Sequence, residues 1–198
     1  MNTQILTAIL SKDSKDSTYK YALLRAMVQC VIDQSPHKEK APNGWIAYPF
    51  GLLIYYWLLY YYPIFASDIF IPQKNGETPE LRRGSTIAFR REFNKVIEFY
   101  KDKGGFPQFR FDLIHETIPE TIQRDVILLL RKLQQTIKKM PMKHLGFYEF
   151  GRHYSLVTGE VKTIRTPSYY GMVKESGRYC ILPDLHRLMD EIGALIIG

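Results

Sequence analysis

An uncharged aromatic run, Ile46–Tyr62, constrains the fold of this chain more than any other feature. It reads IAYPFGLLIYYWLLYYY and has about the minimum length of a membrane-spanning helix. It also contains six tyrosines, and each hydroxyl would need a hydrogen-bond partner in lipid. Tyrosine favours the membrane interface rather than the hydrocarbon centre. We therefore expect a buried helix of a soluble protein and no membrane partner.

Apolar residues at helical spacing, with start and stop signals around them, predict five helices. These helices cover residues 18–34, 49–62, 86–103, 120–140 and 184–197. Pro63, Gly104-Gly105 and Pro141 are stop signals for the second, third and fourth helices. Asp184 can cap the last one.

Runs of aromatic and β-branched residues predict a few short strands. Phe106–Ile114 alternates apolar and polar residues and predicts one strand. Residues 147–150, 154–157 and 160–164 predict a β-hairpin around Thr158-Gly159, and Tyr179–Leu182 predicts a third strand. The expected fold class is mainly α with a small antiparallel β-sheet in the C-terminal third, that is, α+β.

The change of character near Pro141 predicts two parts. Residues 1–140 form a helical domain, and residues 141–198 form a small β-hairpin and helix subdomain. The sequence ends in an apolar segment, Ile192–Gly198, whereas chain termini are usually polar. We therefore expect the natural polypeptide to continue past Gly198 into a further C-terminal module.

The positive charge is concentrated in the second half. The formal net charge is +7 and the pI is near 9.3, which favours an acidic partner. Residues 71–198 hold 21 of the 27 basic residues, and each phosphate that such residues neutralise releases counterions. We expect one continuous nucleic-acid-binding face made of Arg82, Arg83, Arg90, Arg91, Arg131, Lys132, Lys138, Lys139, Lys143, Arg152, Lys162 and Arg165.

A structural role is the alternative for these cations. Cations near the end of the 120–140 helix would stabilise its C-terminus. Glu80 and Glu92 are close enough in sequence to pair with the arginines beside them. The charge pattern leaves both interpretations open.

Common catalytic motifs are absent. The sequence has no HExxH, GxxxxGK[ST], GxGxxG or GxSxG, and its five histidines do not pair at metal-ligand spacing. Cys30 is expected in the core and Cys180 has no evident general base. Since the N-terminus does not resemble a secretion signal, we expect two reduced thiols in the cytoplasm. We expect no cofactor in this chain.

Two other functions compete with DNA binding. Glu160-Val161-Lys162, with Glu149 one strand earlier, matches the acid-x-lysine triplet of Mg²⁺-dependent nucleases, although the usual upstream Pro-Asp is missing. In that hypothesis the two acids hold Mg²⁺ and the lysine assists the attacking water. Alternatively, the tyrosine-rich segment 55–62 exposes aromatic anchors, and the chain is a protein-interaction or dimerisation module.

The N-terminal region resembles a known family. Residues 17–26 read STYKYALLRA, and a later helix contains Tyr55-Tyr56-Trp57. This order resembles the region that precedes the catalytic module in restriction-type bacterial HNH endonucleases. The resemblance implies helices followed by a small β region, with its signature in residues 17–62 and Leu23, Leu24, Tyr55 and Trp57 in the core.

The catalytic part of that family is not in this sequence. The His-Asn-His motif and its flanking Cys-x-x-Cys pairs are absent, so no catalytic residue is carried over. The resemblance implies that a nuclease module, with its Mg²⁺ or Zn²⁺, lies past Gly198 or has been lost. Charge and resemblance together predict a cytoplasmic DNA-binding or target-recognition module of a restriction-type or antiphage HNH endonuclease, with homodimerisation as a further expectation.

Overall fold

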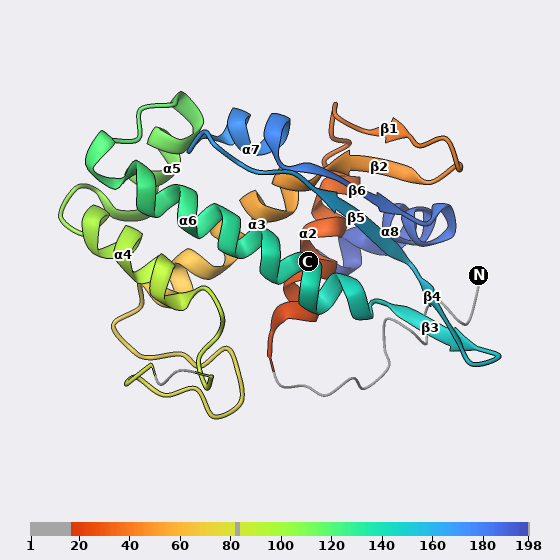
Figure 1. Ribbon diagram of the computed structural model, residues 1–198, viewed down its shortest axis with the longest axis horizontal. Coiled ribbons are helices and arrows are strands. Elements are labelled where there is room, and N and C mark those ends of the chain that lie inside the picture. The colour runs from red at the N-terminus through yellow and green to blue at the C-terminus, as the bar shows by residue number, and fades with distance from the viewer. Residues whose placement is uncertain (1–16, 82–83, 198) are drawn as a thin grey trace.

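Residues 50–62 of the uncharged run lie in a helix at the centre of the molecule. A computed structural model describes residues 17–81 and 84–197, with side chains to residue 193. Its helices are α2 (Tyr19–Ile32), α3 (Phe50–Phe65), α4 (Arg90–Tyr100), α5 (Gly105–His115), α6 (Glu120–Ile137), α7 (Tyr169–Glu175) and α8 (Pro183–Ile197), with a π-helix, η1 (Lys138–Met142), directly after α6 (Figure 1). Helices α2, α4, α6 and α7 all pack against α3. Within the described residues, no helix is both long and apolar enough to cross a bilayer.

Tyrosines of α3 fix both ends of α2. Thr18 is the N-cap residue of α2, and its Oγ1 forms a hydrogen bond of 2.8 Å with the Tyr61 hydroxyl. Asp33, the C-cap residue of α2, accepts a hydrogen bond from the Tyr56 hydroxyl. Between these ends, the Trp57 ring stacks on Tyr19, with ring centroids 5.8 Å apart. Four of the six tyrosine hydroxyls of this run thus have protein hydrogen-bond partners, whereas those of Tyr60 and Tyr62 are buried without one among the described residues.

Helix α3 continues past the expected stop at Pro63. The Pro63 side chain is exposed, so the missing N–H costs the helix only one bond on its solvent side. The extra turn brings Phe65 against Phe89 and Phe93, with ring centroids 6.0 and 5.3 Å away. Packing of Phe65 thus outweighs the proline signal.

Two small antiparallel sheets accompany the helices. The strands are β1 (Glu39–Lys40), β2 (Ile46–Pro49), β3 (Gly146–Glu149), β4 (Arg152–Ser155), β5 (Val157–Val161) and β6 (Gly177–Ile181). One sheet has the order β1-β2-β6-β5, and β3 pairs with β4 in the other. The mainly α class with a small antiparallel sheet is confirmed. The larger sheet is not confined to the C-terminal third, because β1 and β2 come from residues 39–49.

The expected parts on either side of residue 140 share one core. Strand β2 pairs with β6, with Ile46 opposite Ile181, and α2 packs along α8. The buried cluster includes side chains from α2 to α8. The two segments therefore do not have separate cores.

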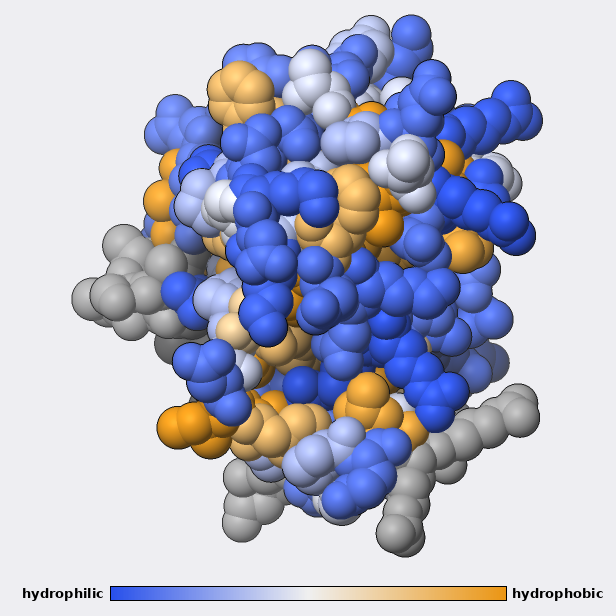
Figure 2. Space-filling model, turned by 90° about the vertical axis from the view of Figure 1, so that its left-hand side faces the viewer, coloured by the Kyte–Doolittle hydropathy of each residue, from blue (hydrophilic) through white to orange (hydrophobic). Residues whose placement is uncertain are grey.

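The predicted strand Phe106–Ile114 is wrong, because these residues lie in α5. Gly104, with φ of 96°, is the N-cap residue of this helix. Phe109 and Leu113, four residues apart, are both buried, while Phe111 between them is 53% exposed. The α4–α5 end of the molecule faces the viewer in Figure 2, and its surface is mostly hydrophilic with small separate apolar patches.

The predicted hairpin turn at Thr158-Gly159 is also wrong. The chain turns at Phe150-Gly151 instead, and β3 and β4 pair on either side of it. Residues Val157–Val161 form β5, which pairs with β6 in the other sheet. The helix predicted at residues 86–103 is shorter in the structure, because only Arg90–Tyr100 are helical there. The short helix α7 was not predicted.

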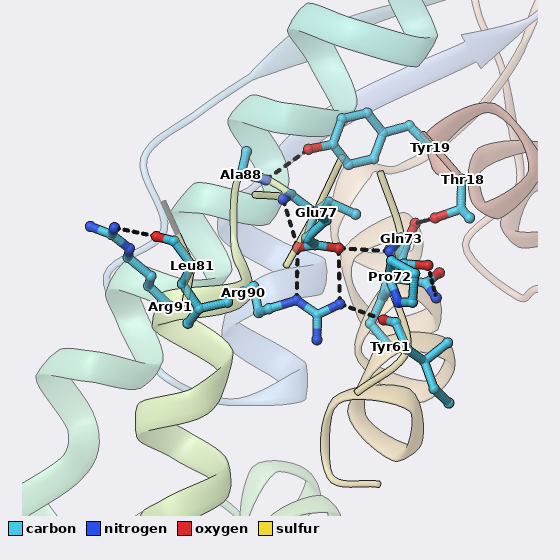
Figure 3. A network of polar contacts seen from close by, with 12 residues as sticks. Thr18, Tyr19, Tyr61, Pro72, Gln73, Glu77, Leu81, Ala88, Arg90 and Arg91 are labelled. Carbon is cyan, nitrogen blue, oxygen red and sulfur yellow. Dashed lines mark hydrogen bonds and ion pairs between the residues drawn. The ribbon is translucent and has the colours of Figure 1, made fainter. Parts of the chain in front are cut away.

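Arg90 is buried rather than available for DNA. Its guanidinium binds both carboxylate oxygens of Glu77, at 2.8 and 3.0 Å, and donates to the Ile71 carbonyl (Figure 3). The same carboxylate accepts from the backbone N–H groups of Gln73 and Ile87. This ion pair joins the segment around Glu77 to the start of α4.

Two effects oppose each other at the Glu77 carboxyl. Burial alone would raise its pKa, but hydrogen bonds from Arg90 and from two backbone N–H groups hold the pKa below its ordinary value. A depressed pKa means that the charged form stabilises the fold above the unfolded-state pKa. That contribution is lost as the pH falls through the folded-state pKa.

We predict that Glu77→Gln lowers the free energy of unfolding by about 3–5 kcal/mol at neutral pH, because the buried Arg90 charge loses its partner. Denaturant unfolding measures this loss. The difference from the wild type should start to shrink below the unfolded-state pKa of about 4.3, and it should vanish once the pH has fallen through the lower folded-state pKa.

Glu80→Gln is the matched control, because Glu80 lies in the same segment with its carboxyl exposed. It should leave unfolding nearly unchanged. Equal stability of the Glu77 and Glu80 variants would contradict the role of the ion pair.

Candidate nucleic-acid interface

A hollow rich in basic side chains lies between η1, the β3–β4 hairpin and β5. Its volume is about 730 Å³. We call it the lysine pocket, and it is lined by Lys138, Lys139, Met142, Lys143, His144, Tyr148, His153, Ser155, Val157, Thr158 and Gly159. No acidic residue of the described chain is among these lining residues. The pocket is thus a site of concentrated positive charge.

The π-helix explains why three lysines gather there. Pro141 has no N–H to donate, so the α-helical pattern of α6 gives way to the wider turn of η1. Pro141 and Met142 are buried and anchor this turn to the core, while Lys139 and Lys143 are exposed. Lys138 is half-buried and donates a hydrogen bond to the Gly159 carbonyl of β5. The lysines therefore stand on a fixed piece of backbone.

One face of the hairpin forms the opposite wall. In the β3–β4 register, Tyr148 faces His153 and Gly146 faces Ser155. The Tyr148 and His153 rings lie 4.9 Å apart. A Cβ at Gly146 would come within 2.6 Å of His153 Nε2, so glycine leaves room for the imidazole. The wall adds two ring systems and a hydroxyl to the lysines.

This arrangement suits an anion with several oxygens. Three like charges around one hollow repel each other, and a bound anion relieves that repulsion. Each lysine ammonium has three N–H donors and acts as a compact charge toward phosphate. Because the hollow is open and lies on the surface, it can take phosphates of a long chain.

The remaining predicted cations do not all join this site. Arg82 and Arg83 lie outside the described residues. Arg90 is wrong as a binding residue, since Glu77 neutralises it. Arg91 donates to the Leu81 carbonyl, and half-buried Arg131 donates through Nε to the Ile164 carbonyl at 2.7 Å.

Other cations lie on separate parts of the surface. Arg91 and Lys132 line a second hollow of about 580 Å³, together with Lys74 and the acidic Glu92. Arg152 pairs in register with Glu149 next to the hairpin turn. Lys162 and Arg165 are exposed in the segment after β5. The observed arrangement is one strong cluster with scattered neighbours rather than one continuous face.

The residues of the nuclease hypothesis lie on different sheets. Glu149 is on β3, whereas Glu160 is on β5 directly opposite Arg178. Within the described residues, no three His, Cys, Asp or Glu side chains form a group that could hold a metal ion.

Burial raises the pKa of Cys30 to about 12, consistent with its predicted place in the core.

The tyrosine-rich segment does not expose anchors. Every side chain of residues 55–62 is buried or half-buried, and Trp57, Tyr61 and Tyr62 are buried. Tyr55 accepts a hydrogen bond from Arg110 Nε at 3.0 Å. The expectation of aromatic anchors in this segment is therefore wrong.

Sequence patterns alone missed the aromatic and imidazole part of the site. Tyr148, His144 and His153 were not among the predicted binding residues, because no spacing rule joins them. The one available signal was the Phe150-Gly151 pair between two alternating runs.

Comparison with known proteins gives a family but no activity. A family model described as a domain of unknown function, DUF8808, matches residues 1–197, so the chain belongs to that family. No curated protein and no solved structure matches the chain. A functional conclusion therefore has to come from the geometry of the lysine pocket.

Proposed function

We propose that this domain binds DNA, with the phosphates of the DNA held in the lysine pocket. The observation that carries the proposal is the gathering of Lys138, Lys139 and Lys143 around one open hollow with no acidic lining residue in the described chain. Contacts to phosphate supply sequence-independent affinity and fix the position of the nucleic acid. The net charge of +7 adds long-range attraction to the same partner.

A small anion fits the pocket less well than a polymer. The lysines lie on more than one turn of backbone, and the exposed Tyr148 ring and the half-buried His153 imidazole line the pocket beside them. Aromatic side chains next to a basic groove are typical of surfaces that track a nucleic-acid strand. A metabolite site would instead enclose most of its ligand.

The link to HNH endonucleases remains a prediction. It rests on the resemblance of residues 17–62, and no catalytic residue of that family is assigned to this chain. Under this proposal the domain would recognise the target and a nuclease module would cut it. The cytoplasmic location and the homodimer likewise remain predictions.

Binding by phosphate contacts predicts a steep dependence on salt. For a fluorescently labelled duplex, a plot of the logarithm of the binding constant against the logarithm of the salt concentration should have a slope of about −2.7 or steeper. Each phosphate neutralised on B-DNA contributes about −0.9, and the pocket offers three lysines. Fluorescence anisotropy between about 50 and 200 mM salt measures this slope. An affinity that stays constant over this range would rule out the proposal.

We further predict that the triple variant Lys138→Glu, Lys139→Glu, Lys143→Glu abolishes duplex binding, because it replaces three attractive charges with three repulsive ones. The matched control is Lys40→Glu, Lys101→Glu, Lys174→Glu, which changes the net charge equally at exposed lysines elsewhere. The control should retain most of the affinity. Equal losses in both triple variants would show that net charge, not this pocket, governs binding. Circular dichroism checks that both variants fold.

A further inference from the structure

The tip of the β3–β4 hairpin carries an unusual residue for a turn. Phe150 is 95% exposed, the highest exposure among the large hydrophobic side chains of the described chain. Its φ is 48° and that of Gly151 is 74°, so both have the positive φ of a type I′ turn. Such turns favour asparagine, aspartate or glycine at the first position.

Phenylalanine is unfavourable here in two ways. A bulky residue at positive φ is strained by its Cβ, and a fully exposed ring gains nothing from the hydrophobic effect. The fold itself gives no compensating contact, since the Phe150 side chain projects into solvent. An exposed, strained ring at the end of a rigid element points to a binding role.

The hairpin holds this ring firmly. On the face away from the pocket, the Phe147 and Tyr154 rings stack with centroids 5.5 Å apart. At its base, Leu156 N–H donates to the Leu145 carbonyl at 3.0 Å, and both side chains are buried. The tip is therefore a fixed platform rather than a loose loop.

A second exposed ring connects this tip to the lysine pocket. Tyr148 is 78% exposed and lines the pocket, and it lies on β3 two residues before the turn residue Phe150. Two residues of extended chain span about 7 Å. The two exposed rings therefore lie close together at one end of the hairpin, and Tyr148 also lines the lysine pocket.

We propose that the nucleic acid bound here is single-stranded DNA, whose bases stack on Tyr148 and Phe150 while its phosphates lie on Lys139 and Lys143. The inference rests on the proposed function and specifies its substrate class. In a duplex, the base faces are covered by neighbouring base pairs and cannot stack on a side chain. In a single strand they are free, and stacking on aromatic rings tolerates any base.

The test compares two single-stranded DNA probes that have the same number of phosphates with one duplex probe. They are a thymidine oligonucleotide of about twelve nucleotides, an abasic strand of equal length, and a duplex of equal length. The wild-type domain should bind the thymidine strand at least about fivefold more tightly than the abasic strand or the duplex. Tighter binding of the duplex would overturn the inference and favour insertion of Phe150 as a wedge between base pairs.

Variants of the two rings separate stacking from charge. Tyr148→Ala and Phe150→Ala should each weaken binding of the thymidine strand by roughly 5- to 150-fold and leave the abasic strand unaffected. Phe111→Ala and Tyr170→Ala are controls at rings that are 53% and 60% exposed on α5 and α7. They should leave binding of both strands unaffected.

Phe150→Asn adds a readout that a structural role would not produce. Because asparagine followed by glycine is the preferred type I′ pair, thermal stability should hold or rise while affinity for the thymidine strand falls. Loss of both stability and affinity would assign Phe150 a structural role and overturn the inference.

Equal, salt-dependent binding of all three probes by the wild type would overturn the stacking of bases on the two rings, while the proposed function would stand. Failure of the wild type to bind any probe would overturn both.

Discussion

Burial of α3 is the constraint on which the rest of the structure depends. Large apolar side chains such as Leu53 each gain about 1.5–3 kcal/mol when fully buried, but the tyrosine hydroxyls of the same helix need partners. Thr18 and Asp33 supply two of them, at opposite ends of α2. Satisfying these hydroxyls therefore sets the position of α2 along α3, and α8 in turn packs against α2.

The parts of the fold that were predictable have strong local signals, and the parts that were missed depend on distant partners. Burial of Ile46–Tyr62 follows from its composition. In Phe106–Ile114, however, Phe109 and Leu113 fit a strand and a helix equally well, and only packing in the folded chain decides between them. Strands β1 and β2 have two and four residues, and their place is set by β6 far along the chain. Such pairing leaves little trace in a short sequence window.

The candidate site shows the same division. Lys138, Lys139 and Lys143 were predictable because they are close in sequence and have few acids near them. Arg90 was wrongly assigned to the same surface because its partner, Glu77, lies thirteen residues earlier in an irregular segment. Tyr148 and Phe150 were missed because the turn was placed at Thr158-Gly159. With the turn placed there, Tyr148 and Phe150 were assigned to a strand. Their exposure near the tip of a hairpin, which indicates a binding role, was therefore not recognised.

The pairing of β2 with β6 has a consequence for synthesis of the protein. Residue 46 meets residue 181, so the larger sheet cannot close until almost the whole described chain has left the ribosome. Until then α3, the most apolar helix, has neither its strand neighbours nor α7 to cover it. Slow closure of contacts so distant in sequence exposes apolar surface for longer than a chain of local contacts would. The apolar surface of α3 is therefore covered only after β6 and α7 have been made.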